Sequence, residues 1–287
     1  METTLVQSNI TETTSVPQQT YYPITPSING KTFAKLMLML DKCGSNHVFF
    51  HIKRSEAGIT FMNSSHIVLH EIIFHLIQNQ NSEEIIFDLA VEKYKKELPL
   101  LLNDDMSWNF NSSTTPNRPS ALFITQPSLN TTITFTLDPN IEEEEEYHVD
   151  SLRDMLGNMV ARTINVADLL NPTIKVTLSE VLVCLWYAND GLHAKTTTND
   201  KDLETIIPTL ATDTQDTREI HFAAKFIRDL LPVFGTIPKK YQKHTLISVY
   251  LQREMPLCLD FQGSDFSLLS FQAPRAEEEE DTSDFEE

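Results

Sequence analysis

Short runs of β-branched and aromatic residues recur along most of the chain, and many alternate with polar residues. Such runs, bounded by turn-forming residues, are typical of strands that bury one face. The predicted strands lie within residues 48–52, 57–61, 72–74, 85–87, 122–124, 132–135, 181–187, 189–193, 246–250 and 257–261. The few helical segments do not alternate regularly with them as in βαβ units. The pattern therefore predicts an α+β fold with mainly antiparallel sheet.

Three segments show helical spacing instead, with apolar residues on one side and basic residues on the other. The first covers residues 31–42, the second 91–98, and the third begins after 219–221 and is expected to end at Pro232. A fourth helix, near 167–178, is interrupted by Asn171-Pro172. In the first, Leu38 and Met39 lie near the basic edge and break the pattern. The basic residues on these four helices are Lys31, Lys35, Lys42, Lys93, Lys96, Lys175, Lys225 and Arg228.

Polar, low-complexity stretches divide the chain into two bodies of similar length. The predicted organisation is a disordered extension (1–27), a first domain (28–140), a connecting loop (141–160), a second domain (161–276) and an acidic tail (277–287). Each body contains a helix, a strand run and a glycine-centred turn, and the two glycines, Gly58 and Gly191, are 133 residues apart. This spacing is consistent with an internal duplication. Residues 111–120 and 194–218 are expected to form polar loops.

The net charge of −19 is concentrated in a few segments. Two acids lie in residues 1–27, five in 142–146 and eight in 277–287, and none of these segments holds a Lys or Arg, so the remainder carries about −4. The apolar fraction of 40% suffices for a sizeable core. The three cysteines are unevenly spaced in apolar contexts, which favours reduced thiols in an intracellular protein. No run suggests a signal peptide or a membrane span.

Motifs for catalysis or metal binding are not apparent in the sequence. It has no glycine-rich phosphate loop, no nucleophile elbow and no paired Cys/His spacing for a metal. His66 and His70 are four apart, but their setting is a strand, which separates the two rings. We therefore expect no catalytic residue, no cofactor and no metal, and do not predict an enzyme.

Two distant stretches together resemble the proliferating cell nuclear antigen family of ring-shaped DNA sliding clamps. In the first, residues 61–69 read Phe-Met-Asn-Ser-Ser-His-Ile-Val-Leu. The second lies near the C-terminus, where residues 255–261 read Met-Pro-Leu-Cys-Leu-Asp-Phe and residues 271–275 read Phe-Gln-Ala-Pro-Arg before an acidic tail. In the family, similar segments flank one peptide-docking pocket. Asn63 stands where the family has Asp, and Phe271 where it has Tyr. The additional segments mark a divergent member, as in a clamp encoded by a large DNA virus.

The resemblance implies two similar clamp domains with inner-face helices, assembled into a homotrimeric ring around double-stranded DNA. The basic residues above would then face the phosphates, with no sequence preference. It also implies a pocket for aromatic-anchored peptides of a DNA polymerase, ligase or nuclease, and a clamp loader as partner, with no membrane. Leu156-Gly157 matches the family's Leu-Gly in the connecting segment. The implied pocket residues are Met62, His66, Ile67, Leu69, Leu156, Met159, Pro256, Phe271, Ala273 and Pro274.

This assignment predicts an intracellular protein at DNA replication sites, in the nucleus or in a cytoplasmic viral factory. Two alternatives remain open at this point. The chain could be one subunit of a heterotrimeric checkpoint clamp, which shares the fold and would need two different partners. It could also be a protein-binding scaffold that kept the pocket without encircling DNA.

Overall fold

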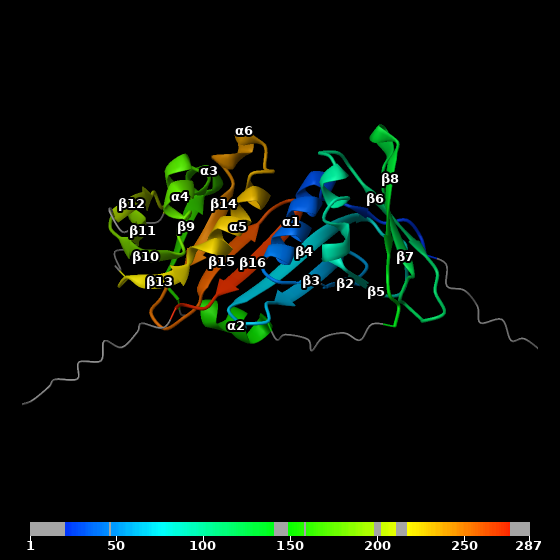
Figure 1. Ribbon diagram of the computed structural model, residues 1–287, viewed down its shortest axis with the longest axis horizontal. Helices are drawn as coiled ribbons and strands as arrows, with labels where there is room; N and C mark the ends of the chain where they lie inside the picture. The colour runs from blue at the N-terminus through cyan, green and yellow to red at the C-terminus, as the bar shows by residue number, and fades with distance from the viewer. Residues whose placement is uncertain are drawn as a thin grey trace, which may run out of the picture.

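The computed structural model describes residues 21–45, 47–140, 149–157, 159–197, 202–210 and 217–275. Its largest component is an antiparallel sheet that runs through both halves of the chain (Figure 1). In spatial order its strands are β5 (Ile85–Leu89), β2 (Val48–Ile52), β3 (Glu56–Met62), β4 (Val68–Gln78), β16 (Phe266–Gln272), β15 (Leu257–Gln262), β14 (Leu246–Tyr250) and β9 (Ala161–Asn165). The short strand β1 (Thr25–Pro26) also pairs with β4.

The two halves of the chain meet where β4 pairs with β16. Their register extends from Phe74 opposite Phe266 to Val68 opposite Gln272, so β4 is hydrogen-bonded to the last described strand. The alternation of side chains along β4 separates two faces. Ile72 and Phe74 are fully buried on the side that carries most helices. Leu69 and Glu71 lie on the opposite face.

Two smaller antiparallel sheets extend the molecule at its two ends (Figure 1). One has the order β6 (Ser107–Asn111), β7 (Ala121–Gln126) and β8 (Thr131–Thr136). The other has the order β12 (Asp202–Ile207), β11 (Gly191–Thr197), β10 (Leu182–Ala188) and β13 (Ile220–Ala223). Among the described strands, β8 pairs only with β7 and β12 only with β11, so each leaves one unpaired edge.

Most helices cover one face of the large sheet (Figure 1). They are α1 (Gly30–Lys42), α3 (Val166–Leu169), α4 (Pro172–Thr177), α5 (Ala224–Phe234) and α6 (Lys239–Gln242). The α1 helix begins at Asn29, whose side chain accepts a hydrogen bond from Thr32 N at 2.9 Å. Its apolar face, led by Phe33, packs against Phe50, Phe74 and Trp108 in the main core.

The predicted strands are confirmed, as is the loop at 111–120, but β12 was missed within the expected loop at 194–218. The predicted helix at 91–98 is wrong. The segment forms two 3₁₀ turns, η1 (Val91–Tyr94) and η2 (Leu98–Leu100). Pro99 has no N–H to donate to the carbonyl of Lys95, which prevents an α-helix from continuing through this point. The predicted end at Pro232 is also wrong. The α5 helix continues to Phe234, with Pro232 on its exposed side and Gly235 N bonded to Leu231 O at 2.9 Å.

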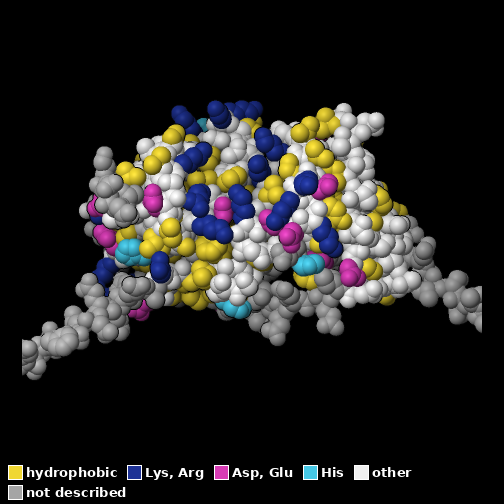
Figure 2. All heavy atoms as spheres, viewed as in Figure 1, with side chains coloured by type: hydrophobic (Ala, Val, Ile, Leu, Met, Phe, Trp, Pro, Cys, Tyr) yellow, Lys and Arg dark blue, Asp and Glu magenta, His cyan; other side chains and the backbone are white. Residues whose placement is uncertain are grey.

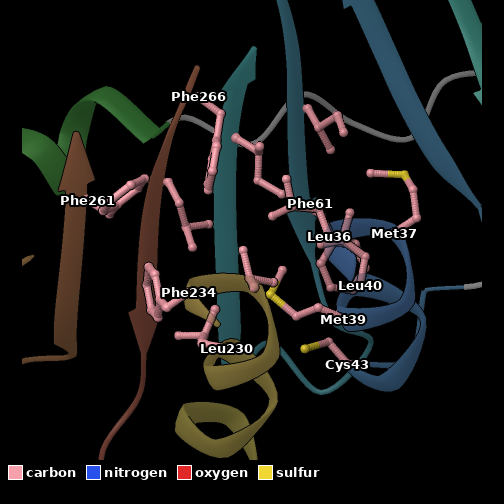
Figure 3. Packing of buried hydrophobic residues seen from close by; sticks show 14 of the residues in the cluster. Leu36, Met37, Met39, Leu40, Cys43, Phe61, Leu230, Phe234, Phe261 and Phe266 are labelled. Atoms are coloured by element: carbon pink, nitrogen blue, oxygen red, sulfur yellow. The ribbon is translucent and has the colours of Figure 1, made fainter. Parts of the chain in front are cut away.

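Met39 is not at a solvent-facing basic edge. It is 2% exposed because α1 packs beside α5, and its side chain points into the space between these helices (Figure 3). Residues 21–27 differ from the expected disorder as well. They carry β1, and Ile24 is fully buried and bridges to Trp108. The remainder of the expected extension lies outside the described residues.

The expected connecting loop at 141–160 contains a helix, α2 (Val149–Leu156). It contacts the face of the large sheet opposite to α1 and α5, through Leu152 and Leu156. These leucines are four residues apart and so share one side of the helix, which explains why this segment forms a helix against an apolar surface. The expected acidic run at 142–146 and the tail from 277 lie outside the described residues.

Candidate functional site

A row of apolar side chains crosses the sheet face beneath α2. Strand registers place Met62 opposite Leu69, Leu69 opposite Phe271, Phe271 opposite Cys258, and Cys258 opposite Tyr250. Paired residues in antiparallel strands project on the same face. Five strands thus contribute one continuous stripe, which we call the apolar row.

The α2 helix covers the apolar row and forms with it a small cluster separate from the main core. Leu69, Cys258, Leu269 and Phe271 are its buried members, and Met62, Leu152, Leu156 and Tyr250 are its partly buried members. Burial raises the pKa of the Cys258 thiol well above its ordinary value and also raises the pKa of Tyr250. Both groups are therefore neutral near pH 7, as suits an apolar surface.

The turn between β3 and β4 is held by Asn63. Its side-chain oxygen accepts hydrogen bonds from the backbone N–H groups of Ile67 (2.8 Å) and Val68 (2.9 Å), and the residue is only 6% exposed. His66 adopts a left-handed backbone conformation with φ of 53°. The amide of Asn63 thus closes the turn without burying a charge there.

The structure brings together only some of the pocket residues named from the sequence. Met62, Leu69, Leu156 and Phe271 belong to the cluster under α2. The others surround it or lie outside it. His66 and Ile67 are exposed in the turn rather than in a strand, Ala273 donates its N–H to Ile67 O at 2.8 Å, Pro256 and Pro274 are half-buried, and Met159 is 8% exposed just after α2.

Sequence reasoning missed four members of the cluster, namely Leu152, Tyr250, Cys258 and Leu269. Leu152 lies four residues before Leu156, a helical spacing that could have been recognised. Tyr250 and Cys258 join the row only through the registers of β14, β15 and β16. Those registers cannot be predicted from the sequence of any one strand.

On the opposite face, Lys and Arg side chains gather over the helices (Figure 2). Lys31, Lys93, Lys96 and Lys175 are exposed and, among the described residues, none of them forms an ion pair with a carboxylate. Lys35 on α1 is half-buried, and Lys225 on α5 is exposed beside the Phe226 ring at 5.8 Å. Basic side chains from both halves of the chain thus lie on one face.

Two of the bases named from the sequence have structural partners instead. Lys42 lies 3.7 Å from the carboxylate of Asp229, which is buried between α1 and α5. Arg228 donates to the carbonyl oxygens of Leu178 (3.1 Å) and Ser179 (3.0 Å) and so ties α5 to the end of α4. The two hydrogen bonds use part of the donor capacity of Arg228, and Asp229 offsets part of the charge of Lys42.

Sequence reasoning also missed the bases of α6. Lys239 and Lys240 are exposed, and Lys239 lines a hollow of about 580 Å³ together with Lys175 and Arg228. The run Lys239-Lys240 with Lys243 was a charge signal that could have been found. Within the described residues, no group of His, Cys, Asp and Glu is arranged to hold a metal ion, and no helix is long and apolar enough to cross a membrane.

Comparison with solved structures identifies the fold. PCNA from Thermococcus kodakaraensis superposes with a TM-score of 0.67 at 14% identity, covering 88% of this chain and all of that one. The chain adopts the PCNA fold. A. fulgidus PCNA, solved with the C-terminal region of FEN-1, gives a TM-score of 0.67 at 10% identity and covers 90% of this chain and 99% of that one.

A third PCNA-fold structure, the PCNA2–PCNA3 complex of Sulfolobus tokodaii, gives a TM-score of 0.68 at 11% identity over 89% of this chain and all of that one. No family model and no curated protein matches the sequence. The PCNA fold expected from two short motifs is thus confirmed, whereas identities of 10–14% with these structures establish the fold alone.

Proposed function

We propose that this protein is a DNA sliding clamp that encircles double-stranded DNA and tethers replication and repair proteins to it. The observation that carries the proposal is the basic helix face. It draws side chains from both halves of the chain onto one side of a shared sheet, in a chain with the PCNA fold (Figure 2). We infer no catalytic activity and an intracellular protein that acts at DNA replication sites.

The chemistry of this face suits phosphates rather than bases. Lys31, Lys93, Lys96 and Lys175 are exposed point charges, and within the described residues no carboxylate partner orients them toward a base edge. Contacts of this kind are independent of sequence and weaken steeply as salt rises, because binding releases counterions. A clamp needs such contacts, since strong or sequence-specific binding would prevent sliding.

Ring closure is supported by the unpaired edges of β8 and β12. The β8 strand lies at one end of the molecule and β12 at the other (Figure 1). Head-to-tail pairing of such edges generates a closed ring when the rotation between subunits closes. We propose a homotrimer. A subunit of a heterotrimeric checkpoint clamp is the alternative, and the solved PCNA2–PCNA3 complex shows that this fold can combine different subunits.

The apolar row and its surroundings are the proposed site for partner peptides. The A. fulgidus structure, solved with a C-terminal region of FEN-1, supports peptide docking on this fold. We expect aromatic-anchored segments of a DNA polymerase, ligase or nuclease to bind here, and a clamp loader to open the ring. A scaffold that binds peptides without encircling DNA would keep this site but would not need the basic face.

The proposal is tested with a charge-reversal variant, Lys31→Glu, Lys175→Glu and Lys225→Glu, and a matched control, Lys53→Glu, Arg54→Glu and Arg253→Glu. The control makes the same change of charge at exposed sites off the helices. Light scattering should give about three times the 32.8 kDa chain mass for all three proteins. Wild type and control should be retained on nicked circular DNA and released when the DNA is linearised.

The charge-reversal variant of the helix lysines (the helix variant) should lose this retention on circular DNA, while its mass in solution stays unchanged. A 32.8 kDa species at micromolar concentration would refute the homotrimer. Equal retention of the helix variant and the wild type would show that the basic face is ordinary solvated surface.

A further inference from the structure

Few of the described side chains of the α2 helix hold it to the sheet. It has eight residues, and its described attachment consists of Leu152 and Leu156 on the apolar row and an ion pair between Arg153 and Glu71. Isolated helices of this length are marginal in water, because nucleation is unfavourable and few hydrogen bonds follow it. The helical state of α2 therefore depends on its docking to the apolar row.

This arrangement has the form of a bound peptide. An amphipathic helix that binds in a groove inserts apolar side chains at positions i and i+4, and Leu152 and Leu156 do so here. Arg153 adds a charge contact with Glu71, which lies on the same sheet face two residues beyond Leu69. As a result, Leu69 and Phe271 are 4% and 3% exposed, although they belong to the proposed docking site.

We propose that α2 is an internal ligand of the docking surface, and that a partner peptide must displace it to reach the apolar row. This inference rests on the proposed docking function. The competing peptide would carry two apolar side chains four residues apart on a helical turn, and a Lys or Arg that forms an ion pair with Glu71. Its apparent affinity is lowered by the fraction of molecules in which α2 is docked, so the helix sets a threshold for partner binding.

The chain carries its own reporter for this displacement. Cys258 is fully buried beneath α2, and its thiol lies in the cluster with Leu152 and Leu156. Only the exposed thiolate reacts with alkylating reagents, so labelling of Cys258 requires the helix to lift. Cys43 is the internal control. It is 5% exposed in the main core, and burial raises its pKa to about 12, so its labelling reports wider unfolding.

The experiment measures iodoacetamide labelling of Cys258 and Cys43 in the full-length protein, with each cysteine quantified by peptide mass spectrometry. In the wild type, Cys258 should react faster than Cys43. Arg153→Glu places two like charges together and should raise the rate at Cys258 by about tenfold, equivalent to about 1.4 kcal/mol, without changing Cys43. The double reversal Arg153→Glu with Glu71→Arg should restore the wild-type rate. Arg54→Glu, an exposed site in the β2–β3 turn, should change neither rate.

Equal rates at Cys258 in the wild type and Arg153→Glu would overturn the proposal. If Arg153→Glu raises the labelling rate of Cys43 as well, hydrogen exchange of the wild type decides between the two explanations. In that measurement, the amides of residues 152–157 should exchange before those of β16. Exchange of both sets at the same rate would show that α2 does not open separately and would overturn the proposal. None of these measurements needs DNA, a ring or a peptide, so a failed ring or DNA test leaves their outcome readable.

Discussion

His70 should make the stability of this protein sensitive to mild acid. The residue is fully buried on the core face of β4, with its Nε2 3.5 Å from the Cys43 sulfur and its Nδ1 without a hydrogen-bond partner among the described residues. Burial lowers the pKa of the His70 imidazole from 6.5 to about 4. The ring is therefore neutral in the folded state over a pH range in which it would be charged in the unfolded chain.

The sign of the effect follows from this depressed pKa. The stability that a neutral His70 permits is fully present above pH 6.5 and is lost as the pH falls from 6.5 toward 4. At pH 5.0, about 1.5 units below the ordinary pKa of histidine, protonation of His70 in the unfolded chain lowers the free energy of unfolding by about 2 kcal/mol. This is a large share of the ~5–15 kcal/mol typical of folded domains.

The assay is urea denaturation at pH 7.5 and pH 5.0, at one fixed protein concentration, for the wild type, His70→Leu and His70→Gln. Carboxylates titrate in all three proteins, so their contribution cancels in the comparison. Between the two pH values, the wild type should lose about 2 kcal/mol more than either variant, because neither variant titrates at this site. The same loss in all three would refute the reasoning, and would mean that the buried ring accepts a proton without penalty.

Two further predictions concern the docking site and the ion pairs of His193. Met62→Ala with Phe271→Ala, introduced into Arg153→Glu so that α2 no longer competes for the row, should lower the affinity for aromatic-anchored peptides at least about thirtyfold by calorimetry, since truncating a buried anchor typically removes ~2 kcal/mol or more. Affinities equal to that of Arg153→Glu alone would exclude the apolar row as the docking site. His193 contacts Asp190 at 2.6 Å and Glu204 at 2.7 Å, and although burial opposes it, these hydrogen bonds raise the pKa of His193. His193→Gln should therefore lower Tm more at pH 6 than at pH 9, because this stabilisation is complete below pH 6.5 and is lost as the pH rises through the raised pKa; equal losses at both pH values would contradict it.

Much of the fold could be predicted because local patterns determine it. The alternation in β2, β3 and β14 identifies strands without knowledge of their neighbours, and the apolar face of α1 is visible in its helical spacing. Predictions failed where tertiary contacts decide the outcome. Met39 is buried by α5, which is far away in the sequence, so the contact cannot be predicted from residues 31–42 alone.

In the candidate site, too, local motifs could be identified from the sequence, whereas the contacts between distant segments could not. Met62, Leu69 and Phe271 could be named because two short motifs resemble a known family, but the row they form depends on the registers of five strands. The β12 strand was hidden in a polar segment, since Asp202 and Glu204 alternate with half-buried Leu203 and Thr205. A closer test for period two would have found it.

The pairing of β4 with β16 has a consequence for how the chain acquires its structure. On the ribosome, residues 68–78 emerge long before 266–272, so β4 has one of its two long edges unsatisfied while almost the entire second half is being translated. An exposed strand edge is a template for wrong pairing, and contacts this distant in sequence form slowly. We therefore expect nascent and C-terminally truncated chains to be prone to aggregation, and a chaperone that shields β4 to raise the yield of folded protein.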